Sequence, residues 1–251
     1  MSEIDYNDVS AKVFANLLTE TAKSAASTVS NLSGKAKLEF EKRFIDVFSK
    51  YVKKSYENIR LVRTLLHRHE PIDISAIYTK NKFLKQINED NVLTLDETAF
   101  FKHIETQKRI IIKGTAGSGK SMYLKHLFTP LVEEAKFIPV FLELRKLNDL
   151  SVNGIDLMLY AEMKAIDDQL EYDHFTHYLN KGKFIFILDG FDEVREAKAS
   201  ELELNIINVA DKYNNIPFII TSRKNKEFAA WKNFSEYEVC PLSIDQINDI
   251  A

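Results

Sequence analysis

Residues 114–121 read Gly-Thr-Ala-Gly-Ser-Gly-Lys-Ser and match the phosphate-binding pattern G-x-x-x-x-G-K-[ST]. The apolar run Ile110-Ile111-Ile112 comes directly before this stretch, and a helical pattern carrying Met122, Leu124 and Leu127 follows it. A strand, a glycine-rich loop and a helix in this order bring backbone N–H groups around a phosphate. The stretch therefore predicts an α/β fold built around a loop that binds a nucleoside phosphate.

The residue types of this loop suit phosphate binding. Glycines let the backbone approach the phosphates closely, and the start of the helix directs N–H groups toward them. Lys120 is expected to reach the β- and γ-phosphates, and the Ser121 hydroxyl to ligate Mg²⁺. The predicted nucleotide-binding residues are Gly114, Thr115, Ala116, Gly117, Ser118, Gly119, Lys120, Ser121 and Met122. A simple glycine turn would not explain the Lys-Ser pair at this position.

A second apolar run, residues 184–188, predicts a buried central strand that ends at Asp189. A carboxylate at this edge of a parallel sheet faces the ligand crevice, where Asp189 would hold Mg²⁺ through its water shell. Asp192 and Glu193 follow closely, and crowded carboxylates are costly unless a cation or a proton-accepting role uses them. We expect Glu193 or Asp192 to position the attacking water, and Asp192 to be able to help hold the metal. The sequence does not choose between the two acids, and a solvated acidic loop is the alternative.

A third apolar run, Ile219-Ile220, leads into Thr221-Ser222-Arg223. If this strand neighbours the strand before the phosphate loop, Arg223 arrives beside the γ-phosphate and could sense or stabilise its charge. The alternative role for Arg223 is a surface ion pair.

After Pro71, short apolar runs alternate with helical patterns, which predicts a mostly parallel sheet with helical crossovers. The predicted strands are Arg109–Lys113, Phe137–Leu144, Lys183–Asp189, Phe218–Ser222 and Tyr237–Pro241. The predicted helices are 119–128, 154–167, 171–181 and 196–213, with Gly182 as a C-cap before a strand. The predicted fold class is thus α/β, a mostly parallel sheet with helices on both faces, preceded by a small α-helical N-terminal module.

Residues 1–70 are expected to form that helical module, because Gly34 is their only glycine and the first proline is Pro71. Pro71 is expected to end the last helix, since the residue before a proline is disfavoured in helical conformation. Apolar residues at spacings of three and four indicate one buried helical face. These residues are Phe40, Phe44, Val47, Phe48, Tyr51, Ile59, Val62 and Leu66. The predicted organisation is a helical module at 1–70, a linker at 71–92 and the NTPase domain at 93–251.

The same N-terminal helix is rich in basic residues, with ten Lys or Arg against four Asp or Glu over residues 35–69. The basic flank consists of Lys42, Arg43, Lys50, Lys53, Lys54, Arg60 and Arg63. It fits either a solvated helix face or a contact surface for an acidic partner or nucleic acid.

Composition limits the remaining possibilities. The 251 residues carry a formal net charge of −3, so no global basic field indicates nucleic-acid binding. No apolar run approaches the roughly 18 residues that a membrane helix needs. The single cysteine, Cys240, allows no internal disulfide, which suits a reducing compartment, and we expect a cytoplasmic protein without a membrane contact. The sequence Ser243-Ile244-Asp245-Gln246 has the form of a capping box and should begin a helix, but only five residues follow it. We therefore expect the chain to be a fragment of a longer protein.

These motifs together resemble the NACHT-type nucleotide-binding domains of the STAND class of signal-transduction ATPases. The matching stretches are Gly114–Ser121, the block Leu188-Asp189-Gly190-Phe191-Asp192-Glu193, Phe137–Arg145, Thr221–Arg223 and Glu70–Ile74. The resemblance implies a three-layer P-loop NTPase domain. It also implies that this domain binds ATP or ADP with Mg²⁺, hydrolyses ATP slowly and self-associates when ATP is bound. It also implies a switch in innate immunity or antiphage defence. The helical, winged-helix and sensor domains that normally follow in this family are not found in these residues.

Three other functions are alternatives to this one, and the first is a GTPase. GTPases commonly use an Asn-Lys-x-Asp segment, and the closest runs, Asn180-Lys181-Gly182-Lys183 and Asn225-Lys226-Glu227, lack its Asp. ATP is therefore favoured over GTP. The other two alternatives are a scaffold that holds nucleotide without significant turnover and a P-loop NTPase linked to nucleic acid.

Overall fold

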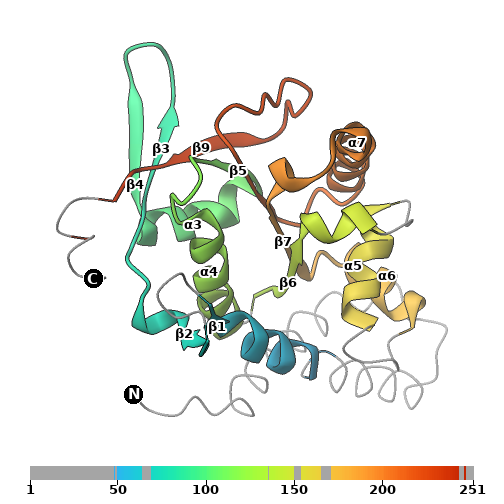
Figure 1. Ribbon diagram of the computed structural model, residues 1–251. Helices are drawn as coiled ribbons and strands as arrows, with labels where there is room; N and C mark the ends of the chain where they lie inside the picture. Colours follow the sequence, from blue (N-terminus) through green and yellow to red (C-terminus); the bar gives the residue numbers. More distant parts are fainter. Residues whose placement is uncertain are drawn as a thin grey trace.

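A seven-stranded sheet with strand order β4-β3-β9-β5-β8-β7-β6 forms the centre of the computed structural model (Figure 1). The structure describes residues 48, 50–63, 69–134, 136–149, 154–164, 171–242 and 246. The strands from β9 to β6 run parallel, and β3 pairs antiparallel with β4 and β9. They are β3 (Lys82–Gln86), β4 (Val92–Asp96), β5 (Arg109–Lys113), β6 (Ile138–Glu143), β7 (Phe184–Asp189), β8 (Phe218–Ser222) and β9 (Ser235–Val239). The predicted α/β fold with a mostly parallel sheet is confirmed.

The three central strands are apolar on both faces because helices cover both sides of the sheet. Residues 110–112, 184–188 and 218–220 have side chains that are fully buried. β8 lies between β5 and β7, so the carboxyl ends of these three strands are adjacent. The loops that follow them therefore meet at one edge of the sheet.

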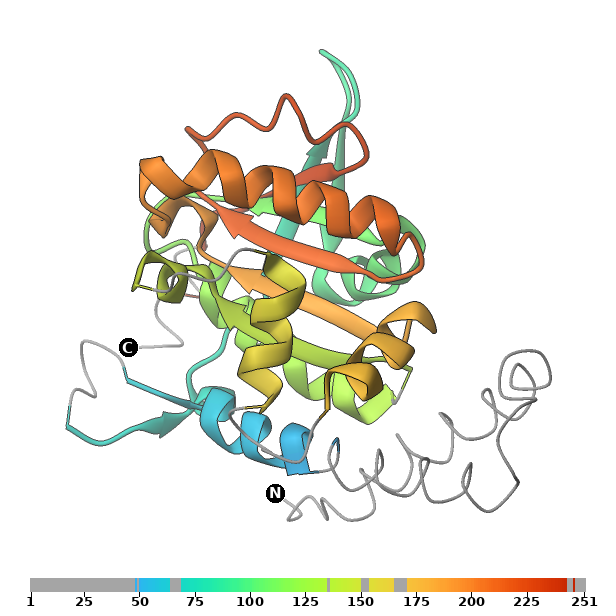
Figure 2. The same cartoon turned by 90° about the vertical axis from the view of Figure 1, so that its right-hand side faces the viewer.

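Helices α3 and α4 lie on one side of the sheet, and α5 and α7 lie on the other (Figures 1 and 2). This arrangement follows from right-handed crossovers between parallel strands. Lys181 is the C-cap residue of α6, and Gly182, which was predicted as the C-cap, follows it with a positive φ of 64°. The helices are α3 (Glu97–Gln107), α4 (Lys120–Glu134), α5 (Ile155–Lys164), α6 (Tyr172–Asn180) and α7 (Glu196–Lys212).

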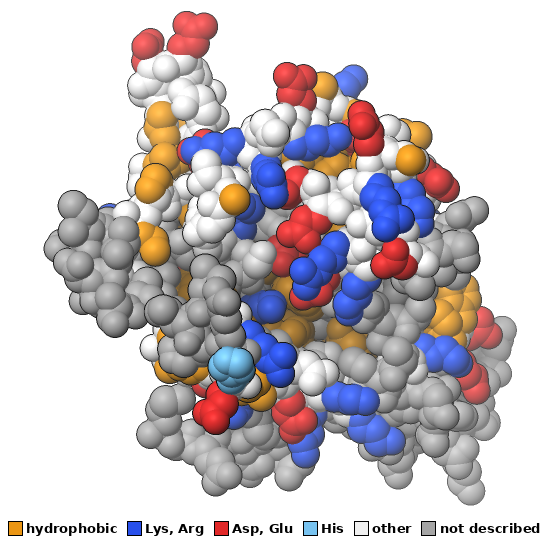
Figure 3. Space-filling model, in the orientation of Figure 1, with side chains coloured by type: hydrophobic (Ala, Val, Ile, Leu, Met, Phe, Trp, Pro, Cys, Tyr) orange, Lys and Arg blue, Asp and Glu red, His pale blue; other side chains and the backbone are white. Residues whose placement is uncertain are grey.

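The β3–β4 hairpin and helix α3 were not expected from the sequence. Residues 82–96 contribute two strands at the edge of the sheet, so part of the segment interpreted as a linker belongs to the sheet. β3 has only two consecutive apolar residues, Phe83 and Leu84, and the side chains of β4 alternate between exposed and partly buried. Neither strand therefore forms a continuous apolar run. Asp96 then caps α3 by accepting a hydrogen bond from the Ala99 N–H at 2.8 Å. Apolar and acidic side chains lie along the protruding hairpin (Figure 3), where Ile87 and Val92 are exposed.

The last N-terminal helix ends earlier than predicted. Residues 50–60 are helical, and Leu61–Val62 then form β1, which pairs antiparallel with β2 (Ile72–Asp73). The prediction that Pro71 ends this helix is therefore wrong. The β1–β2 pairing, together with an ion pair of 3.3 Å between Arg60 and Asp73, replaces the expected last turns. Phe40, Phe44, Val47, Leu66, Lys42 and Arg43 lie outside the described residues.

This helix packs on the body of the protein through Phe48, which is 4% exposed. The Phe48 ring lies 5.5 Å from that of Phe184 at the start of β7 and 6.2 Å from that of Tyr178 on α6. Tyr51 and Val52 are buried in the same core. The helix of residues 50–60 is drawn in blue beneath the α5–α6 pair in Figure 2.

Replacing Phe48 by Ala should lower the free energy of unfolding by about 3 kcal/mol, because it removes a buried ring and leaves a cavity beside Phe184. Urea unfolding followed by circular dichroism measures the change. Lys53→Ala, an exposed position on the same helix, is the control and should change stability little. An equal midpoint for Phe48→Ala and wild type would show that this helix does not pack on the sheet.

No helix among the described residues has the length and apolar character to cross a membrane.

The predicted capping box at 243–246 lies outside the described residues except for Gln246, whose side-chain amide donates to the Lys80 carbonyl at 2.8 Å. Basic and acidic side chains are interspersed over the face shown in Figure 3.

Candidate functional site

The glycine-rich loop lies between β5 and α4, with its backbone held by hydrogen bonds at both ends. The Gly114 N–H donates to the Ser222 carbonyl at 3.2 Å, and the Ser118 N–H donates to the Thr115 carbonyl at 3.2 Å. Gly117 and Gly119 have φ of 76° and 86°, a region that favours glycine. A Cβ at Gly114 would collide with the Ser118 hydroxyl. The loop thus requires its glycines for the backbone to close around a small ligand.

Lys120, the first residue of α4, lies over this loop. Its Nζ donates to the carbonyl oxygens of Gly114 and Thr115, each at 2.9 Å. Burial lowers the pKa of Lys120, and the neighbouring Asp192 and Asp189 carboxylates oppose this shift. The amine therefore lies between the loop and the acidic strand end, where a phosphate would contact it.

Asp189, at the end of β7, joins three elements of the site. Its Oδ1 accepts a hydrogen bond from the Ser121 hydroxyl on α4 at 3.0 Å and another from the Thr221 hydroxyl on β8 at 2.5 Å. The Thr221 oxygen in turn accepts from the Gly190 N–H at 2.8 Å. This chain of bonds fixes the hydroxyl that follows Lys120 beside a carboxylate at the carboxyl edge of the sheet.

The acidic turn after β7 is a short 3-10 helix, η4 (Phe191–Glu193), which begins after Gly190 at a φ of 78°. Its two carboxylates have different surroundings. Asp192 forms an ion pair of 2.8 Å with the Nε of Arg223, and their side chains are 15% and 57% exposed. Glu193 is exposed. β8 does neighbour β5 as expected, and in this structure Arg223 makes the ion pair that the sequence left as its alternative role.

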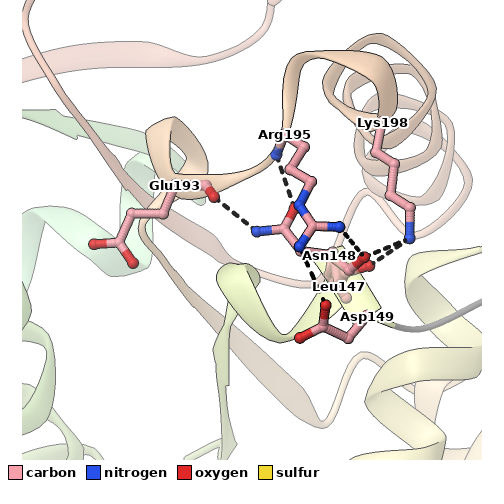
Figure 4. A network of polar contacts seen from close by, with 6 residues as sticks. All are labelled: Leu147, Asn148, Asp149, Glu193, Arg195 and Lys198. Carbon is pink, nitrogen blue, oxygen red and sulfur yellow. Dashed lines mark hydrogen bonds and ion pairs between the residues drawn. The ribbon is translucent and has the colours of Figure 1, made fainter.

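Figure 4 shows a polar network that the motif analysis missed, between the loop after β6 and the segment that follows Glu193. Asn148 lies in η3 (Leu144–Asp149) and contacts the backbone of Glu193 and Arg195. Lys198 donates from α7 to the carbonyl oxygens of Leu147 and Asn148 at 2.9 and 3.0 Å. Single polar residues in a loop form no motif, so these contacts could not be predicted from the sequence.

A second missed cluster lies on the other side of the phosphate loop. The Glu97 carboxylate accepts from the Tyr78 hydroxyl and from the Asn81 N–H at 3.1 Å, and pairs with His126 at 3.2 Å. Burial would raise the pKa of Glu97, but hydrogen bonds from His126 and Tyr78 lower it overall. The Asn81 side chain lies 3.6 Å from where a Cβ on Gly119 would stand. The segment before β3 is thus fixed against the phosphate loop.

Comparison with known families decides the identity of this arrangement. A NACHT domain model matches residues 108–251, more than half of the chain. The chain belongs to the NACHT family. Membership identifies residues 108–251 as a P-loop NTPase domain of the STAND class and implies nucleotide binding, so the resemblance noted in the sequence is confirmed.

Other comparisons add little to the NACHT assignment. The solved structure of PCH-2 from C. elegans is similar at 17% identity and a TM-score of 0.35, over 57% of this chain and 38% of PCH-2. The chain therefore matches less than half the length of PCH-2, and so remote a likeness does not bear on function. No curated protein matches the chain.

Proposed function

We propose that this NACHT domain binds ATP with Mg²⁺, hydrolyses it slowly and uses the bound nucleotide as a signal. The observation that carries the proposal is the position of Asp189, whose Oδ1 accepts hydrogen bonds from Ser121 and Thr221. P-loop NTPases hold Mg²⁺ with a hydroxyl that follows the loop lysine and a carboxylate at the end of a buried strand. Here the hydroxyl and the carboxylate lie 3.0 Å apart.

The residues present fit a nucleoside triphosphate and its metal. Gly114, Gly117 and Gly119 leave the loop backbone open to phosphate oxygens, and Lys120 supplies a cation. Mg²⁺, when bound, neutralises charge on the β- and γ-phosphates, and we assign Ser121 as its protein ligand and Asp189 to its water shell. Among the described residues, no three Asp, Glu, His or Cys side chains form a metal cluster. A magnesium ion held mainly by phosphate and water needs none.

The surroundings of the two acids support different roles for them. A carboxylate oxygen that accepts from a guanidinium is less free to accept a hydrogen bond from a water. Asp192 is paired in this way, whereas Glu193 is exposed. We therefore assign to Glu193 the positioning of the attacking water and the acceptance of its proton. Asp192 holds Arg223 at the edge of the site, and Arg223 serves as the cation that senses the terminal phosphate.

A slow nucleotide switch suits signal transduction, and we propose innate immunity or antiphage defence in the cytoplasm as its setting. NACHT membership and the block at residues 188–193 support this role. ATP is preferred over GTP in this proposal, because no Asn-Lys-x-Asp segment occurs in the sequence. ATP-bound chains self-associate, and the basic flank of the N-terminal helix contacts an acidic partner or nucleic acid.

Asp189→Asn tests the metal site, because Asn keeps an acceptor for the two hydroxyls but removes the charge opposite the ion. Affinity for ATP in Mg²⁺ should fall about tenfold, or about 1.4 kcal/mol, while affinity in EDTA should stay within about twofold. Calorimetric titration measures both. Asp211→Asn, at an exposed carboxylate near the end of α7, is the control. An equal loss of affinity with and without Mg²⁺ would remove Asp189 from the metal site.

A further inference from the structure

Two loops from different crossovers are joined beside the acidic turn (Figure 4). One is η3, which follows β6, and the other is the segment from Glu193 to the start of α7. Arg195 donates through Nη1 to the Asn148 carbonyl at 3.3 Å and through Nη2 to Asp149 at 3.4 Å. Together with Lys198, which holds the carbonyl oxygens of Leu147 and Asn148, these contacts fix the end of η3 in place.

The side-chain amide of Asn148 forms hydrogen bonds to the facing backbone through both its nitrogen and its oxygen. Its Nδ2 donates to the Glu193 carbonyl at 2.9 Å, and its Oδ1 accepts from the Arg195 N–H at 2.8 Å. The residue between them, Val194, is buried. Only an amide side chain offers a donor and an acceptor side by side, so an aspartate or alanine at this position loses at least the bond to Glu193. Asn148 thus clamps the backbone on both sides of Val194.

This clamp holds the backbone from which the Glu193 side chain extends. All the network contacts of Glu193 are made by its backbone, and its carboxylate points away from the network (Figure 4). On the other side, the Glu193 N–H donates to the Gly190 carbonyl at 3.0 Å, which closes the 3-10 turn. The backbone of this exposed residue is therefore held by hydrogen bonds at both of its ends.

We propose that Asn148 is a positioning residue for Glu193 and, through it, sets the rate of nucleotide hydrolysis. The inference rests on the proposed function, in which Glu193 orients the attacking water. A misplacement of about 1 Å at a reacting group costs up to about 100-fold in rate, so releasing one end of the acidic turn reduces turnover. The hydrogen bonds that define this network do not involve the phosphate loop. We therefore expect a change at Asn148 to preserve nucleotide binding.

The test measures single-turnover hydrolysis of labelled ATP and ATP affinity for the 251-residue chain and its variants. Asn148→Ala should lower the hydrolysis rate about tenfold and leave affinity within about twofold. Asn148→Asp, which keeps the acceptor for Arg195 but places an oxygen against the Glu193 carbonyl, should lose at least as much. The matched control is Asn205→Ala, which removes an asparagine that donates to the Glu201 carbonyl, also at 2.9 Å. Circular dichroism checks that each variant folds. If Asn148→Ala does not fold, the comparison is made with Asn148→Asp.

The decisive comparison is a double-mutant cycle with Glu193→Gln. If Asn148 acts through Glu193, Asn148→Ala should have no further effect on hydrolysis once Glu193 is changed. A merely structural role would lower the rate by the same factor in both backgrounds, and that result would overturn the inference. Hydrolysis by Asn148→Ala equal to that of the Asn205 control would overturn it as well. The proposed function fails separately if the wild-type chain hydrolyses no ATP or if Glu193→Gln alone has no effect, and the inference then fails with it.

Discussion

Glu193→Gln should reduce ATP hydrolysis about 100-fold and leave ATP affinity within about twofold, because Gln keeps the size of the side chain and removes the proton acceptor. Glu193 is exposed at the end of the acidic turn, close to Asp189 but not among its hydrogen-bond partners. The change should therefore leave the metal site intact. Single-turnover hydrolysis of labelled ATP measures the rate, and calorimetry measures the affinity.

Asp192→Asn is the companion variant, because the sequence left open which acid acts on water. It should weaken the ion pair with Arg223 and lower hydrolysis less than Glu193→Gln does. Equal hydrolysis by wild type and Glu193→Gln would reassign Glu193 to a structural role. A larger loss in Asp192→Asn would move the water-positioning role to Asp192.

Lys120→Ala should weaken binding of both ATP and ADP at least tenfold, because it removes the cation that lies over the phosphate loop. The loop keeps its shape through the hydrogen bond from Gly114 to Ser222, so the circular dichroism spectrum should not change. Lys125→Ala, on the same helix but outside the loop, is the control. Unchanged affinity in Lys120→Ala with an intact spectrum would exclude this loop as the nucleotide site.

The sequence predicted the core of the domain because the central strands are continuously apolar. β5 and β8 have the predicted bounds, and β6, β7 and helix α7 differ from prediction by a residue at their ends. β9 lies two residues earlier than predicted, and α4 continues six residues past its predicted end. The β3–β4 hairpin was missed because β3 has only two consecutive apolar residues and β4, at the sheet edge, alternates in exposure. The end of the N-terminal helix was misplaced because strand pairing between Val62 and Ile72 outweighed local helical preference.

The candidate site also has a part that the sequence predicted, the motif residues, and a part that it did not, the contacts between loops. Motifs located the loop, Asp189, the two acids and Arg223, since each follows a strand at the carboxyl edge. The pairing of Arg223 with Asp192, the clamp by Asn148 and the Tyr78–Glu97–His126 cluster depend on loops that meet only in three dimensions. No spacing along the chain encodes those contacts.

Calorimetric titration of the wild-type chain with ATP, first in Mg²⁺ and then in EDTA, tests the central claim most directly. The arrangement of Lys120, Ser121 and Asp189 predicts one ATP bound per chain and weaker binding when the metal is chelated. Absence of ATP binding by the folded chain, or binding that does not change on chelation, would contradict the proposal that these residues form a Mg²⁺-nucleotide site.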